Sequence, residues 1–226
     1  MGLIKSIRHL LYLLENNNCN HEHLVKNLDI APSMIPDPNF TLFHIINSIA
    51  GRNYILDTTI IFAAQYLIYV IGGYLVYLWF ARSNYRQEIL FAGYAALLGL
   101  LINFIITLFY FHPRPFMIPT GTVLIAHPLE TSFPSGHTTL TSAISLMLLT
   151  FRELRSTGAI LFVLSLIVGL ARIYAGLHFP MDIVGSLFVA LFSIGLLLTF
   201  KQYLIPVNRI LILFFENTIN KHNKRQ

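Results

Sequence analysis

The sequence predicts an all-α fold, a polytopic membrane helix bundle with five or six transmembrane helices and additional interfacial helices. Three observations support this class. The 226 residues are 55% hydrophobic, with a mean hydropathy of +0.66. Only 11% of them are charged, whereas a soluble domain carries about 25%. The apolar residues also collect in long segments. Membrane lipid is therefore the main solvent of this chain, and its length suits one bundle.

Five apolar segments are the predicted crossings, because a helix needs roughly 20 apolar residues to span the hydrocarbon core. The third segment has a short apolar core, and its polar first turn is expected at the membrane interface. In chain order the segments are Tyr54–Ala81, Ile89–Phe111, Thr138–Phe151, Thr157–Tyr174 and Ile183–Phe200. Five crossings place residues 1–53 on one side of the membrane and the C-terminal tail on the other.

The chain divides into three predicted parts. Residues 1–38 form an N-terminal extension, partly helical or flexible, in which the loop-like stretches ENNNCNHEH and APSMIPDP flank an amphipathic segment. Residues 39–204 form the membrane-embedded domain. It begins with NFTLFHIINSIA, which is too short to span and is expected to be an interfacial helix. Residues 205–226 are expected to form a basic amphipathic tail on the cytoplasmic surface.

The basic residues orient the predicted bundle. The net charge of +5 is not arranged as a basic stripe, so it does not indicate nucleic-acid binding. Loops 82–87 and 152–156 share one side with the tail, and the positive-inside tendency makes this side cytoplasmic. The basic residues there are Arg82, Arg86, Arg152, Arg155, Lys201, Arg209, Lys221, Lys224 and Arg225. Loop 112–137 and turn 176–182 are then expected on the outer side.

Three polar stretches collect on that outer side, each at the membrane end of a predicted crossing. They are FHPRPF, SFPSGHTT and ARIYAGLHFPMD. Polar residues at this depth are costly and are usually functional, so we expect the three stretches to converge although they are far apart in sequence. The candidate site residues within them are Arg114, Ser135, Gly136, His137, Arg172, His178 and Asp182.

The spacing of His178 and Asp182 suits nucleophilic chemistry. The two residues are four apart, and hence on one face if the segment is helical. The carboxylate can then accept a hydrogen bond from one imidazole nitrogen and fix the tautomer that leaves the other nitrogen free. A histidine held in this way is a nucleophile or a base.

The remaining candidates suit phosphate. Arg114 and Arg172 are fixed cations that match phosphate oxygens. The PSGH stretch starts a helix and offers free backbone amides, and Gly136 allows a phosphate to approach closely. His137 is a second imidazole, suited to a general acid. No metal-ligand cluster is evident, so the pattern predicts phosphoryl transfer through a phosphohistidine, without a metal or other cofactor.

The three stretches resemble the signature of the type 2 phosphatidic acid phosphatase superfamily. That signature is Lys, six residues and Arg-Pro, then Pro-Ser-Gly-His, then Ser-Arg, five residues, His, three residues and Asp. The chain departs from it at Thr107, the lysine position, and at Ala171, the serine position. The missing lysine and the phrase INFIITLFYFHPRPF resemble the bacitracin-resistance undecaprenyl-diphosphatase branch, and the likeness runs from about Asn39 into the tail. That branch often has acidic residues where Pro113 and Gly136 stand.

The resemblance implies a role for each candidate. His178 would attack the terminal phosphorus, Asp182 would orient it, and His137 would protonate the leaving oxygen. The residues expected to hold the phosphate are Arg114, Arg172, Ser135 and Gly136. Thr107 is a further candidate for a phosphate contact, although an ordinary membrane-helix threonine is the more common interpretation. His127 is expected to be solvated, and for His112 both a place in the head-group pocket and solvent stay open.

The resemblance further implies a lipid phosphatase of the bacterial cytoplasmic membrane with its active site facing the periplasm or the cell exterior. Such an enzyme removes the terminal phosphate of undecaprenyl diphosphate, recycles the cell-wall carrier lipid and confers bacitracin resistance. Its partners are polyprenyl diphosphate and membrane lipids. The alternatives are a phosphatase for phosphatidylglycerol phosphate, phosphatidic acid or lipid A, and a non-catalytic phospholipid transporter or binding protein. The sequence predicts no oligomeric state.

Overall fold

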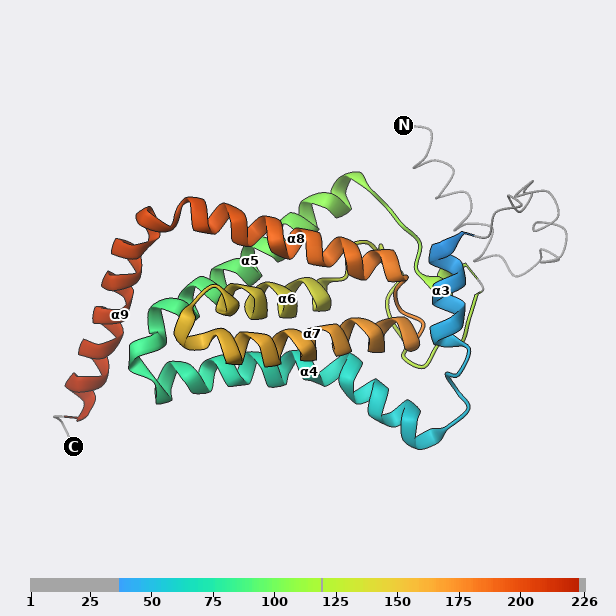
Figure 1. Ribbon diagram of the computed structural model, residues 1–226, viewed down its shortest axis with the longest axis horizontal. Coiled ribbons are helices and arrows are strands. Elements are labelled where there is room, and N and C mark those ends of the chain that lie inside the picture. The colour runs from blue at the N-terminus through green and yellow to red at the C-terminus, as the bar shows by residue number, and fades with distance from the viewer. Residues whose placement is uncertain (1–36, 119, 224–226) are drawn as a thin grey trace, which may run out of the picture. The chain divides into compact units, whose positions relative to one another are not determined.

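The computed structural model of the chain describes residues 37–118 and 120–223 (Figure 1). Within these ranges the chain folds into seven α-helices and no strand, which confirms the predicted all-α class. The first of these helices, α3, spans Pro38–Asn47. All but the last two residues of the predicted N-terminal extension lie outside the described residues.

The five predicted crossings are all helices, and each helix end lies within three residues of the expected position. Four of them, α4, α5, α7 and α8, are long and apolar enough to cross a membrane. The chain is therefore a membrane protein with several crossings. The helices that follow α3 are α4 (Tyr54–Ala81), α5 (Arg86–Phe109), α6 (Gly136–Leu149), α7 (Arg155–Tyr174), α8 (Pro180–Thr199) and α9 (Lys201–Asn223).

Helix α6 is too short to span a bilayer by itself. Its 14 residues give a length of about 21 Å, against roughly 30 Å for the hydrocarbon core. Helices α5, α7 and α8 all pack against it, and nine of its residues are buried. Because protein rather than lipid surrounds α6, the third of the five predicted crossings, its length does not have to match the membrane.

Small and hydroxyl-bearing residues let α6 and α7 approach each other closely. The Ser165 hydroxyl of α7 lies 2.9 Å from the Thr141 hydroxyl and 2.7 Å from the Ser142 hydroxyl of α6. At Gly158 of α7, an added Cβ would come within 2.6 Å of the Leu149 backbone nitrogen. Close packing of this kind and hydrogen bonds between helices are the main sources of helix association in lipid, where the hydrophobic effect is weak.

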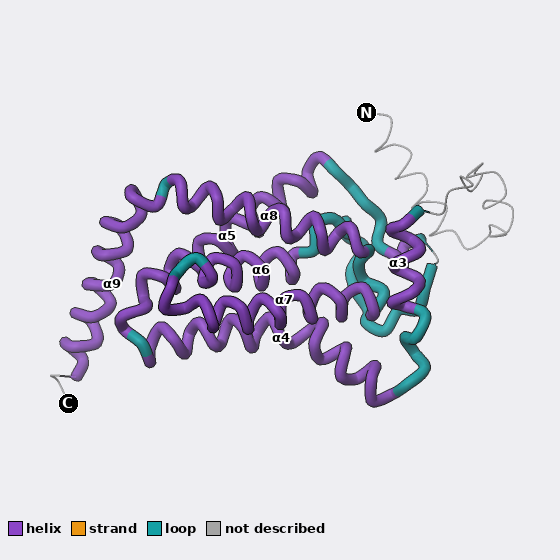
Figure 2. The backbone as a smooth tube through the Cα atoms, in the orientation of Figure 1, coloured by secondary structure: helices purple, strands orange, loops and turns teal. Residues whose placement is uncertain are grey.

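The connections at the two ends of the helices separate the polar motifs from the basic loops. The loop between α5 and α6 and the turn between α7 and α8 lie at the same end as α3 (Figure 2). The connections at residues 82–85 and 150–154, and the start of α9, lie at the other end (Figure 2). The motif-bearing loops thus share one end of the bundle, as the crossing pattern predicts.

Helix α3 is joined to this end of the bundle by one buried asparagine. Asn47 Nδ2 donates to the carbonyl oxygens of Thr122 at 2.8 Å and Tyr174 at 2.7 Å. Its Oδ1 accepts from the Thr122 amide at 2.6 Å. The Phe43 ring packs against the Phe179 ring with 5.1 Å between centroids. These contacts hold α3, the α5–α6 loop and the α7–α8 turn together.

Helix α9 is longer than the predicted tail, since it begins at Lys201 rather than at residue 205. A buried arginine connects it to the start of α5. Arg86 Nη1 lies 2.6 Å from Glu216 Oε1 of α9, and Arg86 Nε donates to the Trp79 carbonyl at 3.2 Å. The guanidinium also lies 5.0 Å from the centroid of the Phe215 ring. Arg86 is therefore a polar link between α9 and the basic end of the bundle, and the Tyr94 hydroxyl of α5, which donates to Asn208 Oδ1 of α9 at 2.9 Å, is another.

Replacing Arg86 with alanine should lower the free energy of unfolding by about 1–3 kcal/mol, because charged hydrogen bonds to Glu216 and Trp79 are lost. Thermal unfolding in detergent measures this as a melting temperature several degrees lower. The matched control is Arg82→Ala, which removes an exposed arginine from the same end and should change the melting temperature little. Equal melting temperatures for the two variants would contradict a role for Arg86 in holding α9.

Candidate active site

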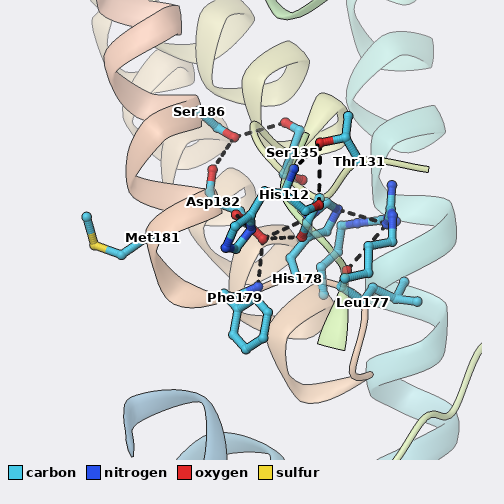
Figure 3. Close-up of polar contacts among 12 residues, drawn as sticks. His112, Thr131, Ser135, Leu177, His178, Phe179, Met181, Asp182 and Ser186 are labelled. Atoms are coloured by element: carbon cyan, nitrogen blue, oxygen red, sulfur yellow. Dashed lines mark hydrogen bonds and ion pairs between the residues drawn. The ribbon is translucent and has the colours of Figure 1, made fainter. Parts of the chain in front are cut away.

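The three polar stretches meet at the α3 end of the bundle (Figure 3). The HPRPF stretch lies in the loop after α5, the PSGH stretch leads into α6, and the turn containing LHFP leads into α8. Hydrogen bonds connect residues 63 and 46 positions apart in the sequence across this end. The expected convergence is therefore present, and the individual contacts determine what the site can do.

Asp182 lies in the first turn of α8 and is fully buried. Its Oδ2 accepts hydrogen bonds from the Phe179 amide at 2.8 Å and from the Ser132 hydroxyl. The same oxygen lies 3.4 Å from His178 Nδ1. α8 begins at Pro180, so His178 stands in the turn before the helix and not on its face. The helix start itself brings the carboxylate back to the imidazole.

His178 has one ring nitrogen on the carboxylate side and the other on the arginine side. Its side chain is buried, with Nδ1 also 3.2 Å from the Ser132 hydroxyl and Nε2 3.4 Å from Arg114 Nη1. Burial, together with the positive charges of Arg172 and Arg114, lowers the pKa of His178 to about 3, although Asp182 opposes the shift. The imidazole is therefore neutral near pH 7. A proton on Nδ1 suits the acceptors beside it and leaves the unprotonated Nε2 with its lone pair on the side of Arg114.

Arg114 is held by backbone and side-chain acceptors around the histidine. Nε donates to the Glu130 carbonyl at 3.2 Å, Nη1 donates to the Leu177 carbonyl at 3.3 Å, and Nη2 lies 3.9 Å from Glu130 Oε2. Burial lowers the pKa of Arg114, and the charges of Glu130 and Asp182 raise it. The guanidinium is fixed with one edge beside His178 Nε2, where it can bind an oxygen of a phosphate under attack.

Arg172 has one nitrogen that donates no hydrogen bond to any described residue. It is 2% exposed at the end of α7, and Nη1 donates to the Ala64 carbonyl of α4 at 3.3 Å. Nη2 lies 3.4 Å from His127 Nε2. Its Nε is buried and has no hydrogen-bond partner among the described residues. A buried donor without a partner is unfavourable until an acceptor such as a phosphate oxygen arrives.

The start of α6 supplies the PSGH residues. Ser135 is fully buried, its hydroxyl oxygen accepts from the Thr138 hydroxyl at 3.2 Å, and its carbonyl accepts from the Ser186 hydroxyl of α8 at 3.0 Å. The first amides of a helix have no partner within it and suit an anion. A Cβ at Gly136 would meet only Leu100 Cδ2, at 3.9 Å. Packing inside the protein therefore does not require glycine here.

A cavity of about 310 Å³ opens beside Arg172 and His137. His127, which the sequence suggested would be solvated, lines it, and burial and the nearby Arg114 lower the pKa of His127. Helix α4 forms one wall of the cavity. The residues that line it are Gln65, Tyr66, Tyr69, Ile125, Ala126, His127, His137, Arg172 and Leu177. The cavity is larger than a single phosphate group requires.

Thr107, at the position of the family's lysine, has its hydroxyl directed into its own helix. Its Oγ1 donates to the Phe104 carbonyl at 2.7 Å. The single hydroxyl hydrogen is thus used within α5. This contact is typical of a threonine in a membrane helix and gives no support to a phosphate contact.

Several residues of this site were not identified from the sequence, because none of the predicted site motifs marks them. Ser132 holds both Asp182 and His178, and only its place in the SFPSGH stretch could have drawn attention to it. Gln65, Tyr66 and Tyr69 belong to an ordinary apolar crossing without a motif. Among residues 37–118 and 120–223, no three or more His, Cys, Asp or Glu side chains group in a way that could hold a metal ion.

Comparisons with known proteins agree on one family. A family model described as the PAP2 superfamily matches residues 88–206. The chain is 38% identical over 188 residues to undecaprenyl-diphosphatase BcrC of Bacillus subtilis (strain 168), which covers 83% of this chain and 96% of that protein. It is 29% identical over 157 residues to the bacitracin transport permease protein BcrC of Bacillus licheniformis, covering 69% of this chain and 76% of the relative.

Solved structures agree with the sequence comparisons. The crystal structure of Aquifex aeolicus LpxE matches this fold with a TM-score of 0.60 and 30% sequence identity. The match covers 71% of this chain and 94% of LpxE. The matched family region contains all seven motif residues from Arg114 to Asp182.

Proposed function

Because the chain belongs to the PAP2 superfamily, we propose that it removes the terminal phosphate of undecaprenyl diphosphate and so recycles the carrier lipid of cell-wall synthesis. The observation that carries the proposal is the position of His178, with Asp182 at one ring nitrogen and Arg114 at the other. A nucleophilic histidine needs this arrangement at a phosphate. The B. subtilis relative named undecaprenyl-diphosphatase supports the choice of lipid.

The first step is attack by His178. Its Nε2 lone pair forms a bond to the terminal phosphorus while the bond from phosphorus to the bridging oxygen breaks. The bridging oxygen takes that electron pair and a proton from His137, and the lipid monophosphate leaves. The proton on His178 Nδ1 stays between the imidazole and Asp182, so the carboxylate stabilises the positive charge of the phosphorylated ring.

The second step is hydrolysis of the phosphohistidine. Water attacks the phosphorus, His137 accepts a proton from that water, and the bond between Nε2 and phosphorus breaks. The electron pair returns to Nε2, inorganic phosphate leaves and the resting site is restored. His137 lines the cavity beside Arg172, which gives both the leaving group and the incoming water a path to it.

The charges at the site suit a phosphate without a metal ion. Arg114 and Arg172 supply two guanidinium groups, and the first amides of α6 add donors for the oxygens that become more negative in the transition state. Arg172 Nε is already buried without a partner among the described residues. We therefore expect phosphate release in EDTA to stay within a few-fold of that in Mg²⁺.

Two features favour a diphosphate over a phosphate monoester. The lysine of the family signature is replaced by Thr107, so fewer cations are present to support a poor leaving group. A diphosphate releases a phosphate, which leaves far more easily than a lipid alkoxide. The cavity of about 310 Å³ beyond Arg172 also leaves space for the second phosphate, with His127 and Gln65 as polar neighbours.

Phosphate release from the purified protein across a panel of lipids tests this function. At equal surface concentration in EDTA, kcat/KM for undecaprenyl diphosphate should exceed that for phosphatidic acid by at least about tenfold, equal to 1.4 kcal/mol. Raised expression should also protect cells against bacitracin, which sequesters the diphosphate lipid. Faster hydrolysis of phosphatidic acid, phosphatidylglycerol phosphate or lipid A would still indicate a phosphatase, but one with a different lipid substrate. Tight binding without turnover would instead indicate a transporter or binding protein.

The active site is expected to face the periplasm or the cell exterior, since the basic loops occupy the opposite end. Cys19 is the single cysteine, so a Cys19→Ser background allows cysteines to be placed at will. Leu129 lies in the α5–α6 loop and is 68% exposed. A cysteine in its place (Leu129→Cys) should react in intact cells with a maleimide that does not cross membranes. Glu153→Cys, at the other end, should react only after lysis. The reverse pattern would invert the topology.

A further inference from the structure

The two oxygens of Asp182 have different surroundings. Oδ2 receives the Phe179 amide, the Ser132 hydroxyl and His178 Nδ1, as described above. Among the described residues, the polar group nearest to Oδ1 is His112, whose Nδ1 lies 3.3 Å away. That approach is outside hydrogen-bond geometry, and neither atom has another hydrogen-bond partner among the described residues. The nucleophile's carboxylate thus lies between two imidazoles, of which the family signature contains one.

The ring of His112 is held firmly in this place. It stacks on Tyr110 with 6.2 Å between centroids and meets the edge of Phe179 at 5.5 Å. The His112 amide donates to the Thr131 hydroxyl at 3.0 Å, and its carbonyl accepts from the Ser132 amide at 2.7 Å. The backbone of His112 is therefore tied to the residue whose hydroxyl holds Asp182.

The tautomer of His112 decides whether its Nδ1 attracts or repels the Asp182 carboxylate. A lone pair on Nδ1 would face the carboxylate oxygen and repel it, so the favourable tautomer carries a proton on Nδ1. An N–H so close to a buried carboxylate oxygen that lacks any other described partner offsets part of the cost of burying that oxygen. A shift of a few tenths of an ångström would complete the hydrogen bond.

His112 is separated from the phosphate side of the site. With Asp182 it lines a second cavity of about 460 Å³, and the residues around this cavity include none of those around the cavity beside Arg172. His112 therefore reaches the reaction through Asp182 and not through the phosphate held by the arginines.

We propose that His112 is a positioning residue that holds Asp182 Oδ1, so that Oδ2 stays directed at His178 Nδ1. This inference rests on the proposed function, since it assigns His112 a part in the phosphohistidine reaction. Without the restraint on Oδ1, the carboxylate can rotate away from His178, and the histidine loses the partner that fixes its tautomer. The expected loss is in kcat, because His112 does not touch the substrate.

Two variants separate positioning from packing. His112→Phe keeps the aromatic ring between Tyr110 and Phe179 and removes the N–H. His112→Asn removes the ring and keeps an N–H near the position of Nδ1. We expect His112→Phe to lower kcat by about 10- to 100-fold, as for other outer partners of reacting groups, with KM within about threefold. His112→Asn should stay within about threefold of wild type in kcat.

The reverse order, an active Phe variant and an inactive Asn variant, would assign His112 to packing and overturn the inference. Each variant is first checked for its melting temperature and monodispersity in detergent. If the Phe variant does not fold, the Asn variant decides alone. A folded Asn variant with kcat near wild type supports positioning, and a fall of more than about tenfold overturns it.

A double-mutant cycle tests the route through Asp182. In an Asp182→Asn background the carboxylate is already gone, so His112→Phe should lower kcat by less than about twofold further. A full additional loss would show that His112 acts elsewhere and would overturn the inference. Failure of the proposed function looks different, because there the wild-type protein itself would release little or no phosphate from undecaprenyl diphosphate. If Asp182→Asn is inactive and His112→Phe is fully active, the inference about His112 is overturned and the proposed function stands.

Discussion

Replacing His178 with alanine should abolish phosphate release, with a fall in kcat of about 10⁴-fold or more, as for other covalent nucleophiles. The reason is chemical, because His178 combines Asp182 at Nδ1 with Arg114 beside Nε2. His112 also faces Asp182, but it lines the other cavity, away from the arginines. His137 faces the cavity beside Arg172, and no hydrogen bond among the described residues links its ring to a carboxylate. Phosphate release from undecaprenyl diphosphate by the purified variant measures the loss.

The matched control is His44→Ala, which removes a histidine from α3 at the same end of the bundle. Within residues 37–118 and 120–223, the His44 ring contacts Thr120 and none of the motif residues, so kcat should stay within about twofold of wild type. A His178→Ala protein with appreciable turnover would mean that another group attacks the phosphorus, or that water does so directly. Either result would remove the phosphohistidine from the mechanism.

Replacing Asp182 with asparagine should lower kcat by about 10³- to 10⁴-fold, by analogy with triads in which the carboxylate orients a histidine. The substitution keeps the shape of the side chain and removes its charge. An amide NH₂ placed at Oδ2 would meet the Phe179 amide and His178 Nδ1, both donors, so the side chain or the imidazole tautomer must flip. A flipped imidazole tautomer puts the proton on Nε2 and removes its lone pair. A flipped amide keeps an acceptor at Nδ1 but has no negative charge to stabilise the phosphorylated ring. Substrate binding should change little, because Arg114 and Arg172 stay in place.

Asp57→Asn is the matched control for Asp182. Asp57 also accepts hydrogen bonds at this end of the bundle, from the Tyr174 hydroxyl at 2.7 Å and from the Gly51 amide at 3.1 Å. It contacts no motif residue through these bonds, so its loss should lower the melting temperature and leave kcat nearly unchanged. If the two asparagine variants had equal kcat, Asp182 would have a structural role alone.

The fold was largely predictable because each crossing is a local pattern. The segment Tyr54–Ala81 was assigned from hydropathy with both ends correct, since lipid is the solvent for most of its length. The place of α6 was harder to foresee. Its 14 residues are shorter than a membrane, and only the surrounding α5, α7 and α8 make that length acceptable. No pattern in a single sequence shows that three other helices surround this one.

The site was predictable where its residues fall in short motifs with regular spacing. His178 and Asp182 are four apart and lie together, although His178 stands in the turn before α8 and does not share a helix face with Asp182 as the spacing suggested. The contacts of Ser132 and His112 with Asp182 join residues 50 and 70 positions apart, and nothing local in the sequence marks them. The α4 wall of the cavity shows the same limit, since Tyr66 and Tyr69 resemble ordinary aromatic residues near a membrane surface.

The most direct measurement is a rapid-quench experiment with undecaprenyl diphosphate labelled in its terminal phosphate, carried out in EDTA with the purified protein. An alkaline quench preserves phosphohistidine, and an acid quench destroys it. We predict label on the protein within the first turnover, stable to alkali, labile to acid and located on the peptide that contains His178. His178→Ala should carry none. Steady turnover with no labelled protein at any time, or label on a different residue, would contradict a His178 phosphoenzyme.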